Sequence, residues 1–155
     1  MSDLTQATVA SPLGTIVLTQ EGDAITRLTW GATRDAPPST SLLARASDQL
    51  VAYFANDLTV FDLPLAPKGS EFQIDVCAAM LAIPFGETRT YGELARYLDA
   101  PAQAIGQACG GNPIPIIIPC HRVLGANGLG GFSGSGGIED KVWLLKHEGA
   151  ASLLI

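Results

Sequence analysis

Cysteine and histidine are scarce in this sequence, and their scarcity excludes two kinds of site. The chain of 155 residues has three cysteines, Cys77, Cys109 and Cys120, an odd number without a CxxC spacing. That pattern argues against a disulfide framework and fits a reducing cytosol. The two histidines, His121 and His147, have no cluster of further ligands around them. We therefore expect neither a zinc site nor another metal site.

Charged residues are also few, and acidic ones outnumber basic ones. They make up 15% of the chain against 47% hydrophobic residues, which supplies a sizeable core and excludes a disordered chain. No apolar run approaches the ~20 residues of a membrane helix. The N-terminal stretch MSDLTQATVA lacks the basic and apolar regions of a signal peptide, so we expect no membrane association. The net charge of −6 argues against a nucleic-acid binder, because such proteins usually carry a basic surface.

A stretch rich in proline and glycine, residues 62–70, divides the chain into predicted domains 1–64 and 65–155. The first domain has three basic and seven acidic residues, a net charge of −4. The second has six basic and eight acidic residues, a net charge of −2, so any contact with DNA belongs to this less acidic domain. Before the break, alternating apolar residues and two turn signals predict short strands. Residues 40–54 then have apolar side chains near a helical period. We expect a small α/β domain here.

The second half reads as helices and loops. A helix is predicted after Ser70, a second begins at the capping box of Thr90 and Glu93, and a short third follows Pro101. The last two resemble a helix-turn-helix, although such a pair is common in proteins that bind no DNA. The third helix has no charged side chain, and Gln103 is one of its two long polar residues. Its small residues suit either entry into a narrow groove of DNA or close packing against another helix, and these residues alone favour neither interpretation.

The stretch IIIPCHRVLG, residues 116–125, raises the question of what Cys120 does. The apolar residues that precede Cys120 favour a buried packing role for it. The histidine and arginine that follow it are the kind of neighbours that make a thiol reactive. His121 is a candidate base and Glu148 a candidate acid to orient it, with an ordinary surface acid as the alternative. The Gly-rich residues 125–137 could form a lid. A reactive thiol is the interpretation we favour, with its substrate left open.

Two stretches, GNPIPIIIPCHRVLG and GFSGSGGIEDKVWLLKHEG, resemble the O6-alkylguanine-DNA alkyltransferases, the methylated-DNA–protein-cysteine methyltransferases. The likeness extends over nearly the whole chain and centres on the acceptor motif PCHRV at residues 119–123. It implies an RNase H-like α/β N-terminal domain and an α-helical C-terminal domain with a helix-turn-helix. The implied activity is DNA repair by irreversible transfer of an alkyl group from O6 of guanine, or O4 of thymine, to the protein's own cysteine. The implied protein is a cytoplasmic monomer without a cofactor, acting once on double-stranded DNA.

The resemblance also implies catalytic roles. Cys120 is the alkyl acceptor, His121 the base acting through a water, and Glu148 the acid that orients the imidazole. Asn112 orders the turn before the motif. Tyr91 helps to rotate the nucleotide and assists the leaving guanine, since O6 of a stacked base cannot be reached without flipping.

Further residues are implied to bind the substrate, and some depart from the family pattern. The carbonyl of Val123 receives the guanine amino group, and Ser133 and Gly134 form a lid over O6. Gln103 stands where the family usually has an arginine that fills the gap left by the flipped base. A tyrosine of the lid is Phe132 here. The family's four-ligand zinc site, present in some relatives, has no counterpart.

These departures leave alternatives to a working repair enzyme. One is a family member with weakened duplex binding that acts on free alkylated bases or single strands. Another is a lesion-binding protein, although relatives of that kind carry a tryptophan where Cys120 stands. A cysteine hydrolase is a third, which the intact PCHRV motif makes improbable.

Overall fold

The chain folds into two units, Met1–Pro67 and Lys68–Ile155, in a computed structural model that describes residues 4–31, 34–125 and 137–150. The division falls three residues after the predicted break, because the segment around Leu65 pairs with the first unit. The Ile25 amide donates to the Pro64 carbonyl at 2.9 Å, and the Ala66 amide donates to the Ile25 carbonyl at 2.9 Å. These backbone bonds keep the segment in the N-terminal unit.

The first unit contains a three-stranded antiparallel sheet in the order β1-β2-β3. The strands are β1 (Leu4–Val9), β2 (Ile16–Glu21) and β3 (Ala24–Trp30). The two-residue turn between β2 and β3 uses Gly22 at φ +59°, a conformation that glycine adopts without steric cost. Alternate side chains of the strands point to one face and form its core. The buried residues of the sheet include Ala7, Val9, Ile16, Leu18, Ile25 and Leu28.

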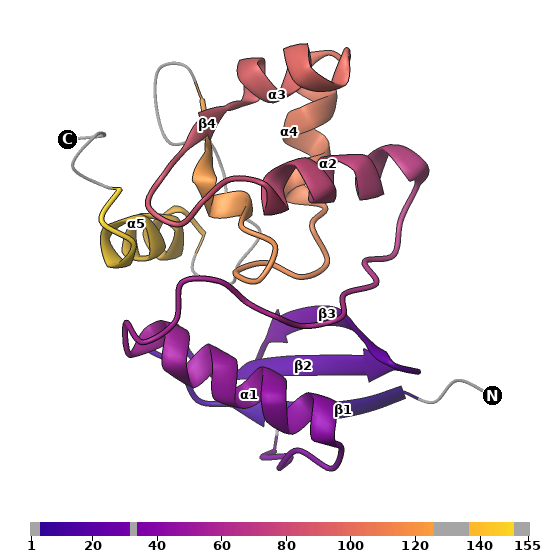
Figure 1. Ribbon diagram of the computed structural model, residues 1–155, viewed down its shortest axis with the longest axis vertical. Helices are drawn as coiled ribbons and strands as arrows, with labels where there is room; N and C mark the ends of the chain where they lie inside the picture. Colours follow the sequence, from indigo (N-terminus) through magenta and orange to yellow (C-terminus); the bar gives the residue numbers. More distant parts are fainter. Residues whose placement is uncertain (1–3, 32–33, 126–136, 151–155) are drawn as a thin grey trace. The chain divides into compact units, whose positions relative to one another are not determined.

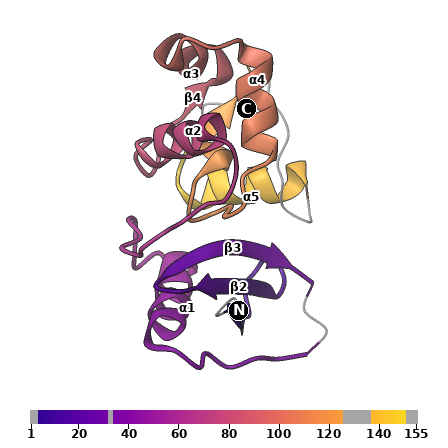
Figure 2. The same cartoon turned by 90° about the vertical axis from the view of Figure 1, so that its right-hand side faces the viewer.

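Helix α1 (Ser41–Phe54) covers that face of the sheet, as Figures 1 and 2 show. Thr40 caps it, because its hydroxyl accepts from the Leu43 amide at 3.0 Å. Its buried side chains are Leu43, Ala46, Leu50 and Tyr53, all apolar positions at the helical period predicted for residues 40–54. The predicted α/β organisation of this half is therefore confirmed.

The second unit is built mainly from the helices α2 (Glu71–Leu81), α3 (Tyr91–Leu98), α4 (Ala102–Gly110) and α5 (Ile138–His147). The predicted caps are present: the Ser70 hydroxyl accepts from the Gln73 amide, and Thr90 and Glu93 form a reciprocal capping box. Between α3 and α4 the chain turns at Asp99, whose φ of +52° is left-handed. The two helices pack together (Figure 1), as the helix-turn-helix prediction required.

A short parallel strand pair in this unit was not predicted from the sequence. Strand β4 (Arg89–Thr90) pairs with β5 (Val123–Leu124), directly after the 3₁₀ turn η1 (Cys120–Arg122). The interpretation of this half as helices and loops alone was therefore incomplete. The pair matters for the site, because it places the beginning of α3 beside the end of the cysteine turn.

None of the helices in the described part of the chain is both long enough and apolar enough to cross a membrane.

Candidate active site

The turn that leads to Cys120 is held by the side chain of Asn112. The Asn112 amide nitrogen donates to the Ile118 carbonyl at 2.8 Å, and its oxygen accepts from the Ile114 amide at 3.0 Å. Between these contacts Ile116 has a φ of +74°, which costs a β-branched residue roughly 1–3 kcal/mol. The Asn112 bonds and the burial of Ile116 at 1% exposure keep the chain in this strained turn. Asn112 therefore joins the beginning and the end of the turn that leads to the thiol.

The three residues of η1 are all buried, with exposures of 4% for Cys120, 0% for His121 and 7% for Arg122. Side chains on a 3₁₀ helix are separated by ~120°, since the helix has three residues per turn. Consecutive side chains therefore point in different directions. His121 and Arg122 both reach the carboxylate of Glu148.

Glu148 is the centre of a buried cluster. Its Oε2 lies 2.8 Å from His121 Nε2, and it accepts two hydrogen bonds from Arg122, at 2.8 Å from Nε and 3.0 Å from Nη2. Arg122 also donates through Nη1 to the Ile83 carbonyl at 2.6 Å. Glu148 is 5% exposed, so its interpretation as a solvated surface acid is excluded. The cluster joins the cysteine turn to the end of α5.

The protonation states in this cluster follow from its hydrogen bonds. Burial raises the pKa of the Glu148 carboxyl, but the bonds from His121 and Arg122 outweigh it and lower the pKa to about 2. Complete burial lowers the pKa of His121 below its usual value, although Glu148 pulls it upward. An ionised carboxylate can only accept, so the neutral imidazole carries its proton on Nε2 and donates it to Glu148. Nδ1 then presents a lone pair, and within the described residues it has no hydrogen-bond partner.

The other two cysteines differ from Cys120 in their surroundings. Burial raises the pKa of the Cys109 thiol to about 12, and Cys120 adds to that rise while Lys141 opposes it. Burial also raises the pKa of Cys77, against the hydrogen bond from Gln73. Both thiols stay protonated at neutral pH and are inert packing residues. The prediction that Cys77 is a packing residue is confirmed by its exposure of 1%.

Lys141 on α5 is part of the site and was missed in the sequence. Its side chain is completely buried, and Nζ donates to the Val123 carbonyl at 2.7 Å. Nζ also lies 5.8 Å from the ring centre of Tyr91, the first residue of α3. The signal was its spacing, because residues 141, 144, 145 and 148 share one face of α5, and Leu144 and Leu145 are buried. A lysine on that apolar face is the sequence signal of a functional residue.

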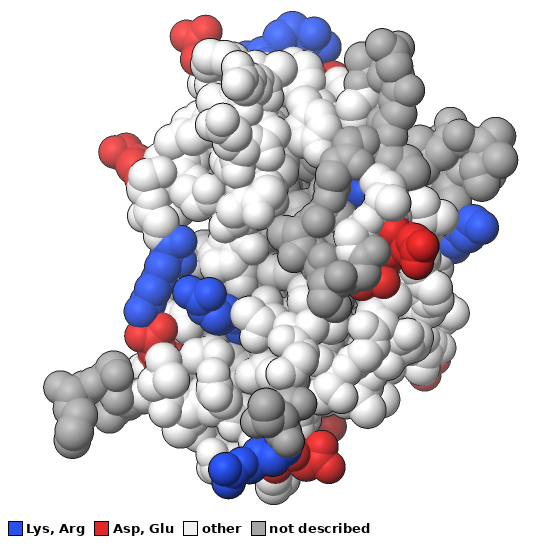
Figure 3. Space-filling view, turned by 180° about the vertical axis from the view of Figure 1, so that it is seen from behind, with Lys and Arg blue, Asp and Glu red and all other residues white. Residues whose placement is uncertain are grey.

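Four further residues named in the sequence analysis are Gln103, Phe132, Ser133 and Gly134. Gln103 is exposed on α4, a different element from the cysteine turn. Ser133, Gly134 and Phe132 lie outside the described residues. Gly106, also on α4, has open space where a Cβ would be, so no packing inside the protein requires it. Figure 3 shows one face of the molecule, on which charged side chains are scattered and most of the surface is uncharged.

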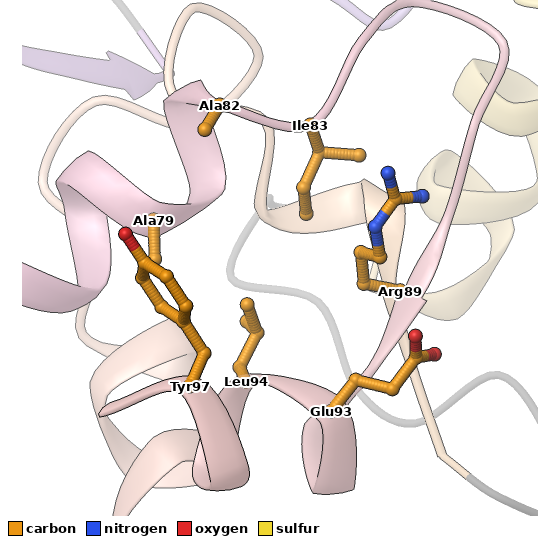
Figure 4. A pocket seen from close by; sticks show the side chains of 7 residues that line it. All are labelled: Ala79, Ala82, Ile83, Arg89, Glu93, Leu94 and Tyr97. Atoms are coloured by element: carbon orange, nitrogen blue, oxygen red, sulfur yellow. The ribbon is translucent and has the colours of Figure 1, made fainter. Parts of the chain in front are cut away.

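A cavity of about 330 Å³ lies between α2 and α3, and Figure 4 shows its lining side chains. Arg89 and Glu93 stand on one side of it and Tyr97 on the other. It contains neither Cys120 nor His121, but Ile83 in its wall is the residue whose carbonyl holds Arg122. Its lining residues are Ala79, Ala82, Ile83, Arg89, Glu93, Leu94 and Tyr97. Among the described residues no group of three or more His, Cys, Asp or Glu side chains could hold a metal ion.

A buried thiol followed by an oriented imidazole, in a unit with a helix-turn-helix, defines a thiol-dependent enzyme with a nucleic-acid-binding fold. Comparison with known families agrees. Residues 71–150 match the family described as "6-O-methylguanine DNA methyltransferase, DNA binding domain", and residues 4–67 match "6-O-methylguanine DNA methyltransferase, ribonuclease-like domain". The chain belongs to the 6-O-methylguanine DNA methyltransferase family.

Individual relatives cover almost the whole chain. A methylated-DNA–protein-cysteine methyltransferase of Mycobacterium bovis is 46% identical over 91% of this chain and 90% of its own length. One from Methanosarcina acetivorans is 45% identical over 90% and 95%. A crystal structure of the Mycobacterium tuberculosis O6-methylguanine methyltransferase has a TM-score of 0.83 at 42% identity, over 96% of this chain and 94% of that one. Another from the same organism, in complex with DNA, has a TM-score of 0.81 at 45% identity, over 93% and 92%.

Proposed function

We propose that this protein repairs DNA by transferring an alkyl group from O6 of guanine to its own Cys120. The observation that carries the proposal is the 2.8 Å contact between His121 Nε2 and Glu148 Oε2, beside an Nδ1 that has no hydrogen-bond partner among the described residues. With Glu148 ionised, this contact favours the tautomer that carries its proton on Nε2 and leaves the Nδ1 lone pair to act as a base. A neutral base beside a thiol is what turns a cysteine into a nucleophile at neutral pH. The activity is that of a methylated-DNA–protein-cysteine methyltransferase, the name that the curated relatives carry.

The transfer begins with removal of the thiol proton. In the proposed relay, Cys120 gives its proton to Nδ1 of His121 through a water molecule. The thiolate attacks the alkyl carbon, the S–C bond forms, and the C–O6 bond breaks with its electron pair left on guanine. The departing guanine takes a proton from Tyr91, and the proton stored on His121 replaces it. The thioether has no route back, so each molecule reacts once.

We propose that residues of the same site hold the flipped guanine. The Val123 carbonyl has one lone pair engaged by Lys141, which leaves the other for the guanine amino group. Tyr91 stands beside it, because β4 pairs with β5. Asn112 fixes the turn that carries the thiol. Ser133 and Gly134 are proposed to close over O6.

Duplex DNA is the proposed partner, with α4 as the element that meets it. The surface of α4 is small and uncharged, and Gly106 leaves room for close approach of a groove. Gln103 is the side chain proposed to enter the gap left by the flipped base. The names of the relatives, and a relative's structure with DNA, do not favour the alternatives of another substrate or a lesion-binding protein. We further propose a cytoplasmic monomer, since three thiols suit a reducing compartment.

The test is incubation with duplex DNA that contains O6-methylguanine, followed by intact-mass and peptide mass spectrometry. We expect one added methyl group per molecule, carried by the peptide that contains Cys120. Cys109→Ser should react like the native protein, whereas Cys120→Ser should gain no methyl. A native protein that stays unmodified, or one in which methyl is spread equally over Cys77 and Cys109, would refute the proposal.

A further inference from the structure

Lys141 is a buried charge that the proposed transfer does not yet use. Its side chain has 0% exposure, and burying an ammonium costs several kcal/mol unless its surroundings offset that cost. Lys146, five residues further along the same helix, is exposed, so its ammonium stays in water and carries no desolvation cost. A lysine retained in the interior at position 141 therefore calls for an anion or a dipole nearby.

The contacts of Lys141 place its ammonium at the cysteine turn. Nζ donates to the carbonyl of Val123, whose own amide donates to the carbonyl of Cys120 at the end of η1. The ring of Tyr91 lies 5.8 Å from Nζ on the side of α3, within the range of a cation–π contact. The carbonyl and the ring fix where the charge stands.

The electrostatics of Lys141 agree with this position. Burial lowers the pKa of Lys141 to about 8, while the thiols of Cys120 and Cys109 raise it. The amine is therefore mostly protonated at neutral pH. Burial raises the pKa of Cys109 to about 12, so that thiol stays neutral, and Cys120 is the other thiol that acts on Lys141.

We infer that Lys141 is the electrostatic partner of the Cys120 thiolate, a positioning residue whose fixed ammonium stabilises the nucleophile while His121 takes the proton. The inference deepens the proposed function and rests on it. It divides the activation of the thiol between two residues: His121 supplies the site for the proton, and Lys141 supplies the charge that makes its loss favourable. Lys141 also lowers the pKa of His121, which keeps the base neutral before the reaction.

Several titratable groups face Lys141, and the experiment has to separate them. Cys120 and His121 belong to η1, Cys109 belongs to α4, and Tyr91 begins α3. The pKa of Cys109 is raised to about 12, and burial lowers the pKa of His121, which keeps the imidazole neutral. A pH profile of thiol reactivity between about pH 5 and pH 9 therefore reports on Cys120 and on Lys141 itself.

The test is the reaction of Cys120 with iodoacetamide, a small neutral reagent that needs no DNA. Its rate is measured against pH in Lys141→Met, with peptide mass spectrometry to assign the modified thiol. An opposite charge close to an ionisable group moves its titration by about one to three pH units. We expect the midpoint of the profile to rise by that amount in Lys141→Met, with the rate below the midpoint falling about tenfold per unit. Lys146→Met, the same change at the exposed position of α5, should leave the midpoint unchanged.

Two outcomes decide the inference. A folded Lys141→Met protein with the native midpoint overturns it, because a merely structural lysine would leave the thiol's titration alone. Lys141→Arg, which keeps the charge, should retain most of the native profile. The reaction with iodoacetamide is independent of the DNA reaction, so native protein that fails to take methyl from DNA refutes the proposed function and not this electrostatic pairing.

A second measurement needs no change at Lys141. Native protein and Cys120→Ser are labelled with ¹³C at the lysine ε-carbons, and the NMR signal of Lys141 is titrated. Removing the Cys120 thiol removes the larger of the two thiol contributions that raise the pKa of Lys141, so the titration should move to lower pH in Cys120→Ser. An identical Lys141 titration in both proteins contradicts the pairing even if Lys141→Met does not fold.

Discussion

Replacement of Glu148 by glutamine tests the protonation of the site most directly. Lowering the pKa of Glu148 from 4.5 to about 2 means that its surroundings favour the carboxylate over the acid by roughly 3 kcal/mol. In Glu148→Gln, an amide NH₂ turned toward His121 replaces an acceptor with a donor. His121 must then accept through Nε2 and carry its proton on Nδ1, which can no longer take a proton from the thiol. The opposite orientation of the amide sets its NH₂ against the Nε–H of Arg122 instead.

We expect Glu148→Gln to slow methyl transfer by about 10²-fold or more, since a wrong tautomer costs up to about 10⁴ in a comparable triad. Stability should fall by about 3 kcal/mol, because Arg122 is left as an uncompensated buried cation. The assay is a single-turnover rate with methylated duplex DNA, and circular dichroism checks the fold. Glu139→Gln, an exposed acid at the beginning of the same helix, is the control and should react normally. A folded Glu148→Gln protein that reacts within twofold of the native rate would refute the tautomer argument.

Three further predictions concern the DNA surface and the effect of acid. Gln103→Arg should raise the single-turnover rate on duplex DNA more than on single strands, because a cation adds phosphate attraction and fills the gap; equal increases would contradict it. Gly106→Ala should raise the melting temperature, since glycine costs a helix about 1 kcal/mol, yet slow the duplex reaction; an unchanged duplex rate would show that no groove approaches there. Native pKa values of His121 and Glu148 lie below their unfolded values, so the unfolded chain binds more protons in acid. The free energy of unfolding, measured in urea, should therefore fall as the pH drops below about 6.5 and again below about 4.5; a flat profile would contradict this.

Features set by neighbouring residues could be predicted from the sequence. The capping box of Thr90 and Glu93 depends on residues three apart, and the turn at Gly22 depends on one residue that tolerates a positive φ. The same holds for α1, whose apolar spacing is a local pattern. Such signals need no knowledge of the rest of the fold. The motif around Cys120 is equally local, which is why the candidate nucleophile and its neighbouring base were found.

Features set by distant residues could not be predicted in the same way. The pairing of β4 with β5 joins positions 34 apart, and each strand is only two residues long, too short to show a period. Arg122 makes two hydrogen bonds to Glu148, 26 residues away, and a third to the backbone carbonyl of Ile83, which no side-chain pattern encodes. Lys141 was missed for a different reason: its spacing was visible, but a lysine is expected at the surface.

Comparison of two buried thiols shows what makes one of them reactive. Cys109 and Cys120 are 5% and 4% exposed, so they are removed from water to almost the same degree. Burial alone makes a thiol inert, and Cys109, whose Sγ lies 3.7 Å from the sulfur of Met80, shows the result with a pKa of about 12. Chemistry at Cys120 therefore cannot come from exposure. It has to come from neighbours that favour the anion, and the structure offers His121 for the proton and Lys141 for the charge. In the proposed function, the small, uncharged surface of α4 meets the DNA, and the buried groups around Cys120 make its sulfur the one that reacts. Substitutions at Gln103 and Gly106 of α4 should therefore change the rate with DNA and leave the rate with iodoacetamide unchanged.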